Sequence, residues 1–305
     1  MRRKRGATRG GQRGGQRGGQ RGAAHLAGPG RLVLGELARS RSAIVGGAII
    51  LLFVCLAVIA PLVTPYNPEE MDPENALQTP GHGHLMGTDD FGRDIATRVL
   101  FGTRISLTVG IVAVGIGGSI GLIVGLLAGY FGGPFDFFVM RLIDVMLTFP
   151  GILLALLIMT VLGPSLTNVM IAVGISDVPV YVRLVRGSVL SAKEHGYVEA
   201  ARGVGCSRTS IMIKHILPNV LAPFIVVTTL EVANAILLSA TLSFLGMGAQ
   251  PPTPEWGAML NEGRRYIRTG WWMITFPGLA IMFSVLGINL LGDGLRDALD
   301  PKLAG

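Results

Sequence analysis

Two acidic residues lie inside long apolar stretches of the chain. Burying a carboxylate there costs free energy, so these residues are candidates for a specific role. Asp177 and Glu231 would each cost about 2.5 to 3.5 kcal/mol in a bilayer core, so they should face protein or water rather than lipid. Asn234 lies one helical turn after Glu231 and could share its site. Two roles remain open for these side chains: lining a path that accepts an amine group, or pairing with polar groups on neighbouring helices.

Residues that could act in catalysis do not form a recognisable site. The chain has no Gly-Lys-Ser/Thr phosphate loop and no His-Glu-x-x-His zinc motif. His82 and His84 lack a third ligand nearby, which favours a solvated turn over a metal site. Cys55 and Cys206 lie far apart and indicate neither a disulfide nor a metal centre. We expect a non-catalytic chain that holds no metal or cofactor of its own.

The composition is that of a membrane protein. The 305 residues are 50% hydrophobic and only 15% charged, and the mean hydropathy is +0.55. A water-soluble exterior of this size needs more charge, so lipid must replace water over much of the surface.

The net charge of +7 comes from the first 41 residues. They hold 11 of the 26 Lys+Arg and one acid, which is +10, while the other 15 bases and 18 acids sum to −3. This tail repeats Gly-Gly-Gln-Arg three times, and we expect it to be disordered because it has little apolar surface to bury. Attraction to membrane lipid or a signal for membrane orientation is favoured over RNA binding, so no nucleic-acid partner is expected.

Six apolar stretches are long enough to cross a bilayer core of roughly 30 Å. They cover residues 42–63, 105–130, 142–162, 165–182, 219–248 and 271–291. We therefore predict an all-α membrane protein with six transmembrane helices. Its parts would be the tail (1–41), a first helix (42–63), an extracytoplasmic loop (64–104), a five-helix core (105–292) with an internal loop (186–218), and a C-terminal tail (293–305).

The distribution of basic residues predicts which side of the membrane each loop occupies. With both termini cytoplasmic, the cytoplasmic segments hold 20 of the 26 Lys and Arg, and the opposite face holds six. An excess of Lys and Arg marks the cytoplasmic side. Arg141 and Asp144, three residues apart near that side, are expected to form a local ion pair.

Two further patterns concern contacts between helices. Gly117, Gly121, Gly125 and Gly129 recur every fourth residue and would let another helix approach closely, either within this chain or from another subunit. In the internal loop, Tyr197, Ala201 and Val204 share one face of a predicted short helix. A glycine turn follows it, and a second helical stretch leads to Pro218. An exposed helix with small residues at its surface suggests a protein partner.

The internal loop resembles the EAA loop of ABC-importer permeases. Glu199-Ala200-Ala201 is followed by Gly205 and then by Leu217-Pro218. The stretch Gly87-Thr88-Asp89-Asp90-Phe91-Gly92-Arg93-Asp94 is similar to an external loop motif of the C-type subunits of dipeptide, oligopeptide and nickel importers. Residues 242–257, 276–281 and 289–301 contain further segments similar to the same subunits, so the resemblance extends in order from about residue 40 to residue 304.

The resemblance implies partners and a mechanism. A second, homologous permease would complete the translocation path, two partner ATPases would bind ATP and Mg, and an extracytoplasmic substrate-binding protein would deliver the cargo. Closure of the ATPases would move a coupling region that comprises Glu194, Tyr197, Glu199, Ala200, Ala201, Gly205, Leu217 and Pro218.

The resemblance favours di- or oligopeptides as cargo, and the amine accepted near Asp177 and Glu231 would then be that of a peptide. Nickel, haem and glutathione are alternatives for the same machinery. A secondary transporter or channel, and a membrane anchor that holds nucleic acid with its tail, are alternatives of other classes.

Overall fold

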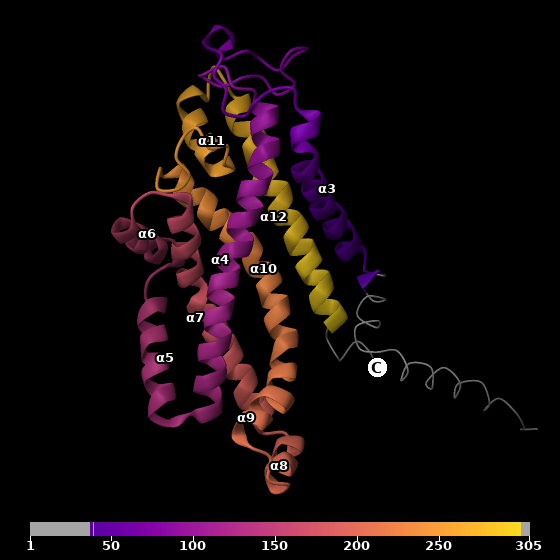
Figure 1. Cartoon of the computed structure of the whole chain (residues 1–305), viewed down its shortest axis with the longest axis vertical. Coiled ribbons are helices and arrows are strands. Elements are labelled where there is room, and N and C mark those ends of the chain that lie inside the picture. Colours follow the sequence, from indigo (N-terminus) through magenta and orange to yellow (C-terminus); the bar gives the residue numbers. More distant parts are fainter. Residues whose placement is uncertain (1–36, 39, 300–305) are drawn as a thin grey trace, which may run out of the picture.

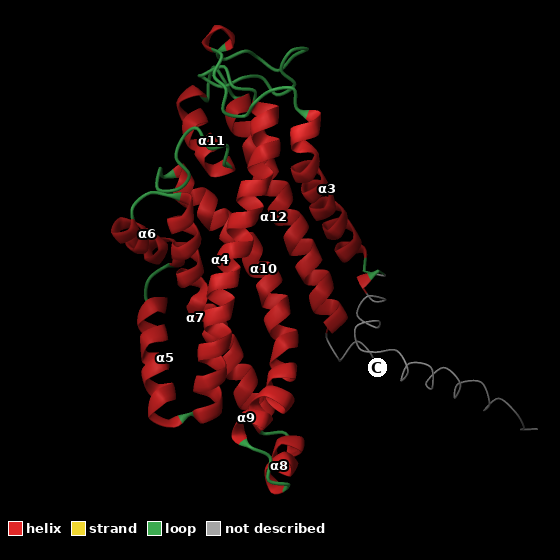
Figure 2. Ribbon diagram, in the orientation of Figure 1, coloured by secondary structure: helices red, strands yellow, loops and turns green. Residues whose placement is uncertain are grey.

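The computed structural model describes residues 37–38 and 40–299, so the predicted disorder of the tail falls almost wholly outside it. Within this part the chain is mostly helical and forms no β-sheet (Figures 1 and 2). The α-helices are α3 (Arg41–Val63), α4 (Ile95–Phe131), α5 (Gly133–Leu147), α6 (Gly151–Leu162), α7 (Leu166–Lys193), α8 (Gly196–Gly203), α9 (Arg208–Ile211), α10 (Leu217–Phe244), α11 (Trp256–Gly263) and α12 (Trp272–Leu299). Short turns of other helix types are η2 (Pro73–Asn75), η3 (Met212–Ile216) and η4 (Arg264–Tyr266).

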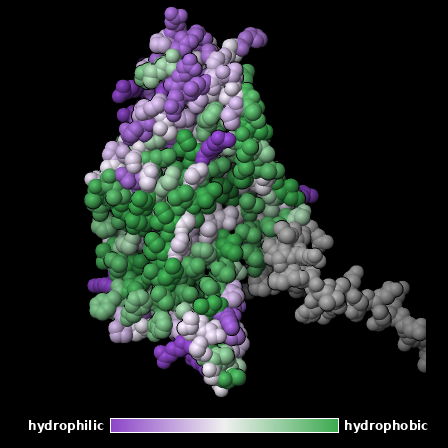
Figure 3. Space-filling view, viewed as in Figure 1, coloured by the Kyte–Doolittle hydropathy of each residue, from purple (hydrophilic) through white to green (hydrophobic). Residues whose placement is uncertain are grey.

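Five helical segments are long and apolar enough to cross a membrane, and the pair α5–α6 makes a sixth candidate if its two parts count as one span. The predicted all-helical membrane fold is thus confirmed. On the face drawn in Figure 3, hydrophobic residues cover most of the middle of the bundle and polar residues gather at its two ends. We call these the α11 end, which carries the long loop between α3 and α4, and the α8 end (Figure 1).

The third predicted span is not a single helix. Residues 142–162 divide into α5 and α6, whose axes differ by 94°, and α6 lies at the side of the bundle, turned away from the direction of α5 (Figure 1). Pro150 explains the break, because proline lacks an N–H and disfavours a helical conformation in the residue before it. Its carbonyl accepts from the N–H groups of Leu153 (2.9 Å) and Leu154 (3.0 Å), so a new helix begins there.

Three helices extend beyond the apolar stretches that predicted them. α4 begins at Ile95 rather than 105, α7 continues to Lys193 rather than 182, and α12 continues to Leu299. Parts of the predicted 64–104 loop, 186–218 loop and 293–305 tail are therefore helical, while the predicted division of the chain at the membrane surface stays a prediction. Hydropathy marks only the part of a helix that lies in hydrocarbon, whereas backbone hydrogen bonding continues into water.

The glycine stripe of α4 packs against α7 of the same chain. A Cβ at Gly117 would lie 2.6 Å from the Gly174 carbonyl oxygen, and one at Gly121 would collide with the Tyr181 side chain. Cβ atoms at Gly125 and Gly129 would approach Val185 and Val189 to 2.8 and 2.9 Å. The sequence left open whether this stripe packs within the chain or against another subunit, and the structure shows close packing within the chain.

The helices α3 and α12 lie side by side, with the start of one beside the end of the other. A Cβ at Gly294 of α12 would lie 2.5 Å from the Cβ of Ala43 in α3. Pro61 cannot donate to the Ala57 carbonyl as an ordinary helical residue would. Instead Arg104 of α4 donates from Nε to that oxygen at 2.5 Å, which fastens α3 to α4 at the point where the helix lacks its own bond.

Candidate coupling and transport sites

The short helix α8 protrudes at one end of the bundle (Figure 1) and ends in a glycine cap. The Cys206 N–H donates to the Ala201 carbonyl (3.1 Å) and the Gly205 N–H to the Arg202 carbonyl (3.0 Å). Gly205 has a φ of +84°, the left-handed conformation that such a cap requires and that glycine adopts without strain. Ser207 then begins α9 by accepting from the Ser210 N–H.

One side of α8 is held by the bundle, and the other side is largely exposed. Val198 is fully buried in a cluster with Val185 and Val189 of α7 and with Ile216 and Val220 near the start of α10. On the outer side, Tyr197 is 40% and Val204 is 86% exposed. Glu194, Glu199 and Ala200 are also exposed, and Ala201 is half-buried.

Polar contacts fix the segment that carries α8. Lys193 at the end of α7 donates to the carbonyls of Gly129 (3.2 Å) and Tyr130 (3.0 Å) at the end of α4. Arg186 makes two bonds to the Asp136 carboxylate of α5, at 2.5 and 2.6 Å. The short helix therefore stands on a base built from three long helices.

The predicted ion pair between Arg141 and Asp144 is wrong. Asp144 pairs with Arg183 of α7, at 2.8 Å. Spacing along one helix cannot reveal such a partner, because the two residues meet only once α5 packs beside α7.

The second helical stretch of the internal loop runs directly into a membrane helix. Leu217 and Pro218 open α10, and η3 before them is a π-helical turn in which the Leu217 N–H donates to the Met212 carbonyl. Proline has no N–H for the Lys214 carbonyl and its ring would crowd that oxygen, so a wider turn suits this position. Leu217 is half-buried against the Val198 cluster, which joins α8 to the base of α10.

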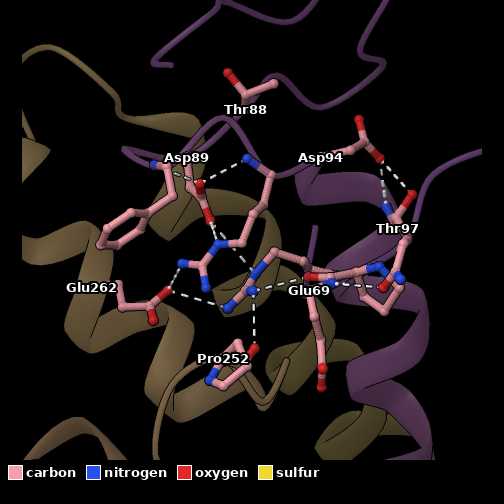
Figure 4. A network of polar contacts seen from close by, with 12 residues as sticks. Glu69, Thr88, Asp89, Asp94, Thr97, Pro252 and Glu262 are labelled. Atoms are coloured by element: carbon pink, nitrogen blue, oxygen red, sulfur yellow. Dashed lines mark hydrogen bonds and ion pairs between the residues drawn. The ribbon is translucent and has the colours of Figure 1, made fainter. Parts of the chain in front are cut away.

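The motif at residues 87–94 forms a buried polar centre at the α11 end (Figure 4). Asp89 accepts from the backbone N–H groups of Phe91 and Arg93, each at 2.9 Å, and from Arg93 Nε at 2.6 Å. Glu262 of α11 accepts from Arg93 Nη2 at 2.9 Å and from Arg98 Nη2 at 3.2 Å. Arg93 and Arg98 are each 1% exposed, so the two charges are compensated inside the protein, as buried charges must be.

Other residues of the motif fasten the loop to the helices. Asp94 caps α4 by accepting from the Thr97 N–H and hydroxyl, each at 2.7 Å. The Thr88 carbonyl oxygen accepts a hydrogen bond from Nε1 of Trp272 in α12, at 2.9 Å. A Cβ at Gly92 would overlap the Asp72 carbonyl, and one at Gly87 would lie 2.6 Å from the Gln78 carbonyl oxygen.

His84 does not lie in a solvated turn. Its Nδ1 lies 3.0 Å from the Asp94 carboxylate, and its ring lies 4.9 Å from that of Tyr66. A side chain that is only 12% exposed belongs to the polar centre of the loop. No group of three or more possible metal ligands occurs among the residues that the structure describes.

Two important carboxylates at the α11 end have no role assigned from the sequence, although Glu255 lies in the 242–257 segment that carries part of the resemblance. Besides Glu262, Glu255 caps α11 by accepting from the N–H groups of Gly257 (3.0 Å) and Ala258 (2.8 Å). Burial raises the pKa of both carboxyls above its ordinary value, while the facing arginines oppose the change at Glu262. An acid directly before the helix could have suggested the cap at Glu255, but nothing local marks Glu262.

The acids in the apolar stretches lie on two helices that pack together. Asp177 is on α7 and Glu231 is on α10, and Glu231 accepts from the Asn234 amide at 3.2 Å. Asp177 Oδ2 is buried and has no hydrogen-bond partner among the described residues.

One stretch of the chain matches the Gly-x-Ser-x-Gly pattern that holds the nucleophilic serine in many hydrolases, but it does not form the strand-to-helix turn of that motif. Residues 117–121 read Gly-Gly-Ser-Ile-Gly, but they lie inside α4 and the Ser119 hydroxyl donates to the Gly115 carbonyl.

Known families match most of the chain. Residues 121–305 match the binding-protein-dependent transport system inner membrane component, and residues 28–80 match the N-terminal transmembrane domain of oligopeptide transport permease C. The chain belongs to this family of importer permeases. The resemblance inferred from the motifs is thereby confirmed, and the protein is a membrane-embedded transport subunit.

Individual relatives cover nearly the whole permease. A dipeptide transport system permease protein, DppC, from Alkalihalophilus pseudofirmus is 49% identical over 279 residues, 90% of each chain. A glutathione transport system permease protein, GsiD, from Escherichia coli is 47% identical over 268 residues, 88% of each chain.

Solved structures show the same fold at lower identity. The MetNI methionine ABC transporter, in an inward-facing conformation, matches with a TM-score of 0.55 and 21% identity, over 67% of this permease and 96% of that chain. An amino acid ABC transporter matches with a TM-score of 0.51 and 20% identity, over 66% of this permease and 94% of that chain.

Proposed function

We propose that this permease is the C-type subunit of an ATP-driven importer of short peptides. A second permease completes the translocation path, and two ATPase subunits that bind ATP and Mg supply the energy. A substrate-binding protein delivers cargo at the α11 end, and both termini lie in the cytoplasm. The observation that carries the proposal is α8: an exposed helix with the Glu199-Ala200-Ala201 motif, mounted on helices that cross the membrane.

The contacts of α8 support its role as the coupling element. A partner that grips the exposed side, at Tyr197 and Val204, pushes on a helix whose opposite side is packed against α7 and α10 through Val198. Protein interiors are close-packed, so displacement of Val198 is passed to its neighbours. Closure of the ATPases on nucleotide can then change the tilt of two membrane helices and open the path on alternate sides.

The chemistry of the relatives' cargo supports a peptide. Glutathione is a tripeptide in which one peptide linkage is made through a side-chain carboxyl group. A dipeptide and glutathione therefore both have an ammonium group and at least one carboxylate on a short backbone. Nickel or haem is the alternative cargo, and it predicts different ligands in the binding protein.

Transport by the reconstituted importer tests the proposal. The permease, its partner permease, both ATPases and the binding protein are placed in liposomes, and uptake of labelled alanyl-alanine is followed with ATP inside. We expect uptake that stops without ATP or without the ATPases. Concentrative uptake by this chain alone would establish a secondary transporter instead.

The coupling role is tested by Glu199→Lys, with Asp293→Lys as a control for an exposed acid at the end of α12. Glu199 has no intramolecular partner in the described structure, so the variant should insert and assemble normally. We expect it to lose ATP-driven uptake and substrate-stimulated ATP hydrolysis at least tenfold, while Asp293→Lys retains both. Normal stimulation in Glu199→Lys would count heavily against α8 as the coupler.

Deletion of residues 1–30 separates the importer from a nucleic-acid anchor. We expect transport to survive the deletion, whereas an anchor that uses its basic tail would lose its function.

A further inference from the structure

A polar cluster lies where α4, α7 and α10 meet. Asp177 and Tyr181 lie one turn apart on α7, and Glu231 lies on α10. Tyr181 is completely buried; its hydroxyl, which lies beside the Thr228 side chain, forms no hydrogen bond of ordinary geometry among the described residues, and neither does Asp177 Oδ2. Buried polar groups are nearly always paired, so these two groups, one turn apart, have capacity to accept hydrogen bonds from a ligand.

The cluster carries negative charge without a base to compensate it. Neither Asp177 nor Glu231 forms an ion pair with any described Lys, Arg or His, and the one contact of Glu231 is the neutral Asn234 amide. Both acids lie near the middle of helices that can cross the membrane, where an uncompensated charge is costly. Either protonation of the carboxyls or a positive group from outside this chain would remove that cost.

A surface groove lies beside Tyr181, and its lining includes none of the three cluster residues. It measures about 500 Å³, lies between α4 and α10, and is lined by Gly118, Ser119, Phe224 and Thr228 among others. The hydroxyl-bearing end of Tyr181 lies directly beneath it, since a Cβ at Gly118 would be 3.6 Å from Tyr181 Cζ. The Tyr181 ring also lies 5.5 Å from that of Phe224. The groove is mostly apolar and suits a side chain rather than a second charge.

We infer that Asp177, Tyr181 and Glu231 form a binding site within the membrane for the ammonium group of the transported peptide. This inference rests on the proposed function. An alkylammonium group has three N–H donors, and carboxylate oxygens and a phenolic oxygen are matching acceptors. The apolar groove beside the cluster accommodates the side chain next to the amine.

A simple amine tests the site without the binding protein. n-Butylammonium is added to the purified permease–ATPase complex, and saturation transfer from protein to ligand is measured by NMR, with n-butanol as the neutral control. We expect transfer to butylammonium in the wild type and its loss in the double variant Asp177→Asn, Glu231→Gln. The control variant Glu74→Gln, which alters an exposed acid of the outer loop, should retain it.

Transport kinetics provide the second readout. In the reconstituted importer, each single neutralisation should raise the KM for alanyl-alanine about tenfold, the size expected for one charge-assisted hydrogen bond. Tyr181→Phe removes a hydroxyl that is unpaired in the structure, so it should raise KM several-fold without lowering the melting temperature. Rescue of KM in Glu231→Asp would further support a charged contact.

Three results would overturn the site. Equal saturation transfer in the wild type and the double variant would show that no such site exists, as would an unchanged KM in both single variants. Loss of the second permease during purification of the variants would show that the carboxyls pair with a basic residue of that partner. If wild-type uptake of dipeptide fails while butylammonium still binds, the cargo assignment is wrong but the amine site stands.

Discussion

At the scale of single residues, Gly205 is the position where backbone conformation and proposed function meet most directly. Its φ of +84° costs an L-residue with a side chain about 1 to 2 kcal/mol, although no neighbouring atom would obstruct a Cβ there. Gly205→Ala should therefore loosen the end of α8 by backbone strain alone. We expect a several-fold loss of ATP-driven uptake with normal membrane insertion.

The matched control for this prediction is Gly203→Ala. Gly203 lies in α8 itself, also has no atom near a Cβ, and has no left-handed φ. Alanine stabilises a helix relative to glycine by about 1 kcal/mol, so this variant should transport normally. Equal losses in the two variants would mean that any added methyl group harms coupling, and the cap would not be the reason.

Glu255 predicts a dependence of stability on pH. Its folded-state pKa is raised by burial, so the folded protein keeps the proton at pH values where the unfolded carboxyl has lost it. Glu255 therefore favours folding at acid pH, and this contribution is lost as the pH rises from about 4.5 through the raised pKa. The melting temperature of the solubilised complex, compared with that of Glu255→Gln, should fall over this interval. Parallel curves for the two proteins would contradict the prediction.

At the scale of the helices, the contact between α4 and α7 depends on residues without side chains. A Cβ at Gly121 would collide with the Tyr181 side chain and lie 3.2 Å from the Val182 nitrogen. Gly121→Ala should therefore force the two helices apart and lower the melting temperature by several degrees. Gly187→Ala, at an exposed position of α7 with open space around it, should be neutral or slightly stabilising, and an equal loss there would argue against the packing contact.

The elements also show what could be predicted from the sequence. Apolar stretches located the five helical segments of the described chain that are long and apolar enough to cross a membrane, because hydrocarbon demands about 20 apolar residues in a helix. They did not reveal the bend at Pro150, because hydropathy carries no information about the direction of a helix axis. The helix, glycine turn and helix around Glu199 were predictable from local rules, because a helix end depends on neighbours only a few residues away.

The polar centre at the α11 end was not predictable in the same way. The Gly87–Asp94 motif indicated that the loop is distinctive, yet its structural partner Glu262 lies far along the chain. No local rule brings these residues together, because they meet only when α11 folds against the start of α4. The same holds for Asp144 and Arg183, and for the groove above Tyr181.

At the scale of the whole molecule, the permease is stiff at one end and exposes a contact surface at the other. The α11 end is held by buried charges that join the loop, α4 and α11, whereas α8 at the opposite end leaves Val204 and part of Tyr197 exposed. This asymmetry suits a subunit that keeps a fixed receiving surface while motion enters from the α8 end.

The break between α5 and α6 has a consequence for biogenesis. At 1.5 Å per residue, the 15 residues of α5 and the 12 of α6 are about 22 and 18 Å long, and each is too short for a core of roughly 30 Å. Neither half can establish its own sidedness during synthesis, so the pair must wait for α7. A reporter fused after Leu162 should be found on both sides of the membrane, and one fused after Lys193 only inside. A single, uniform location after Leu162 would show that the bent pair inserts unaided.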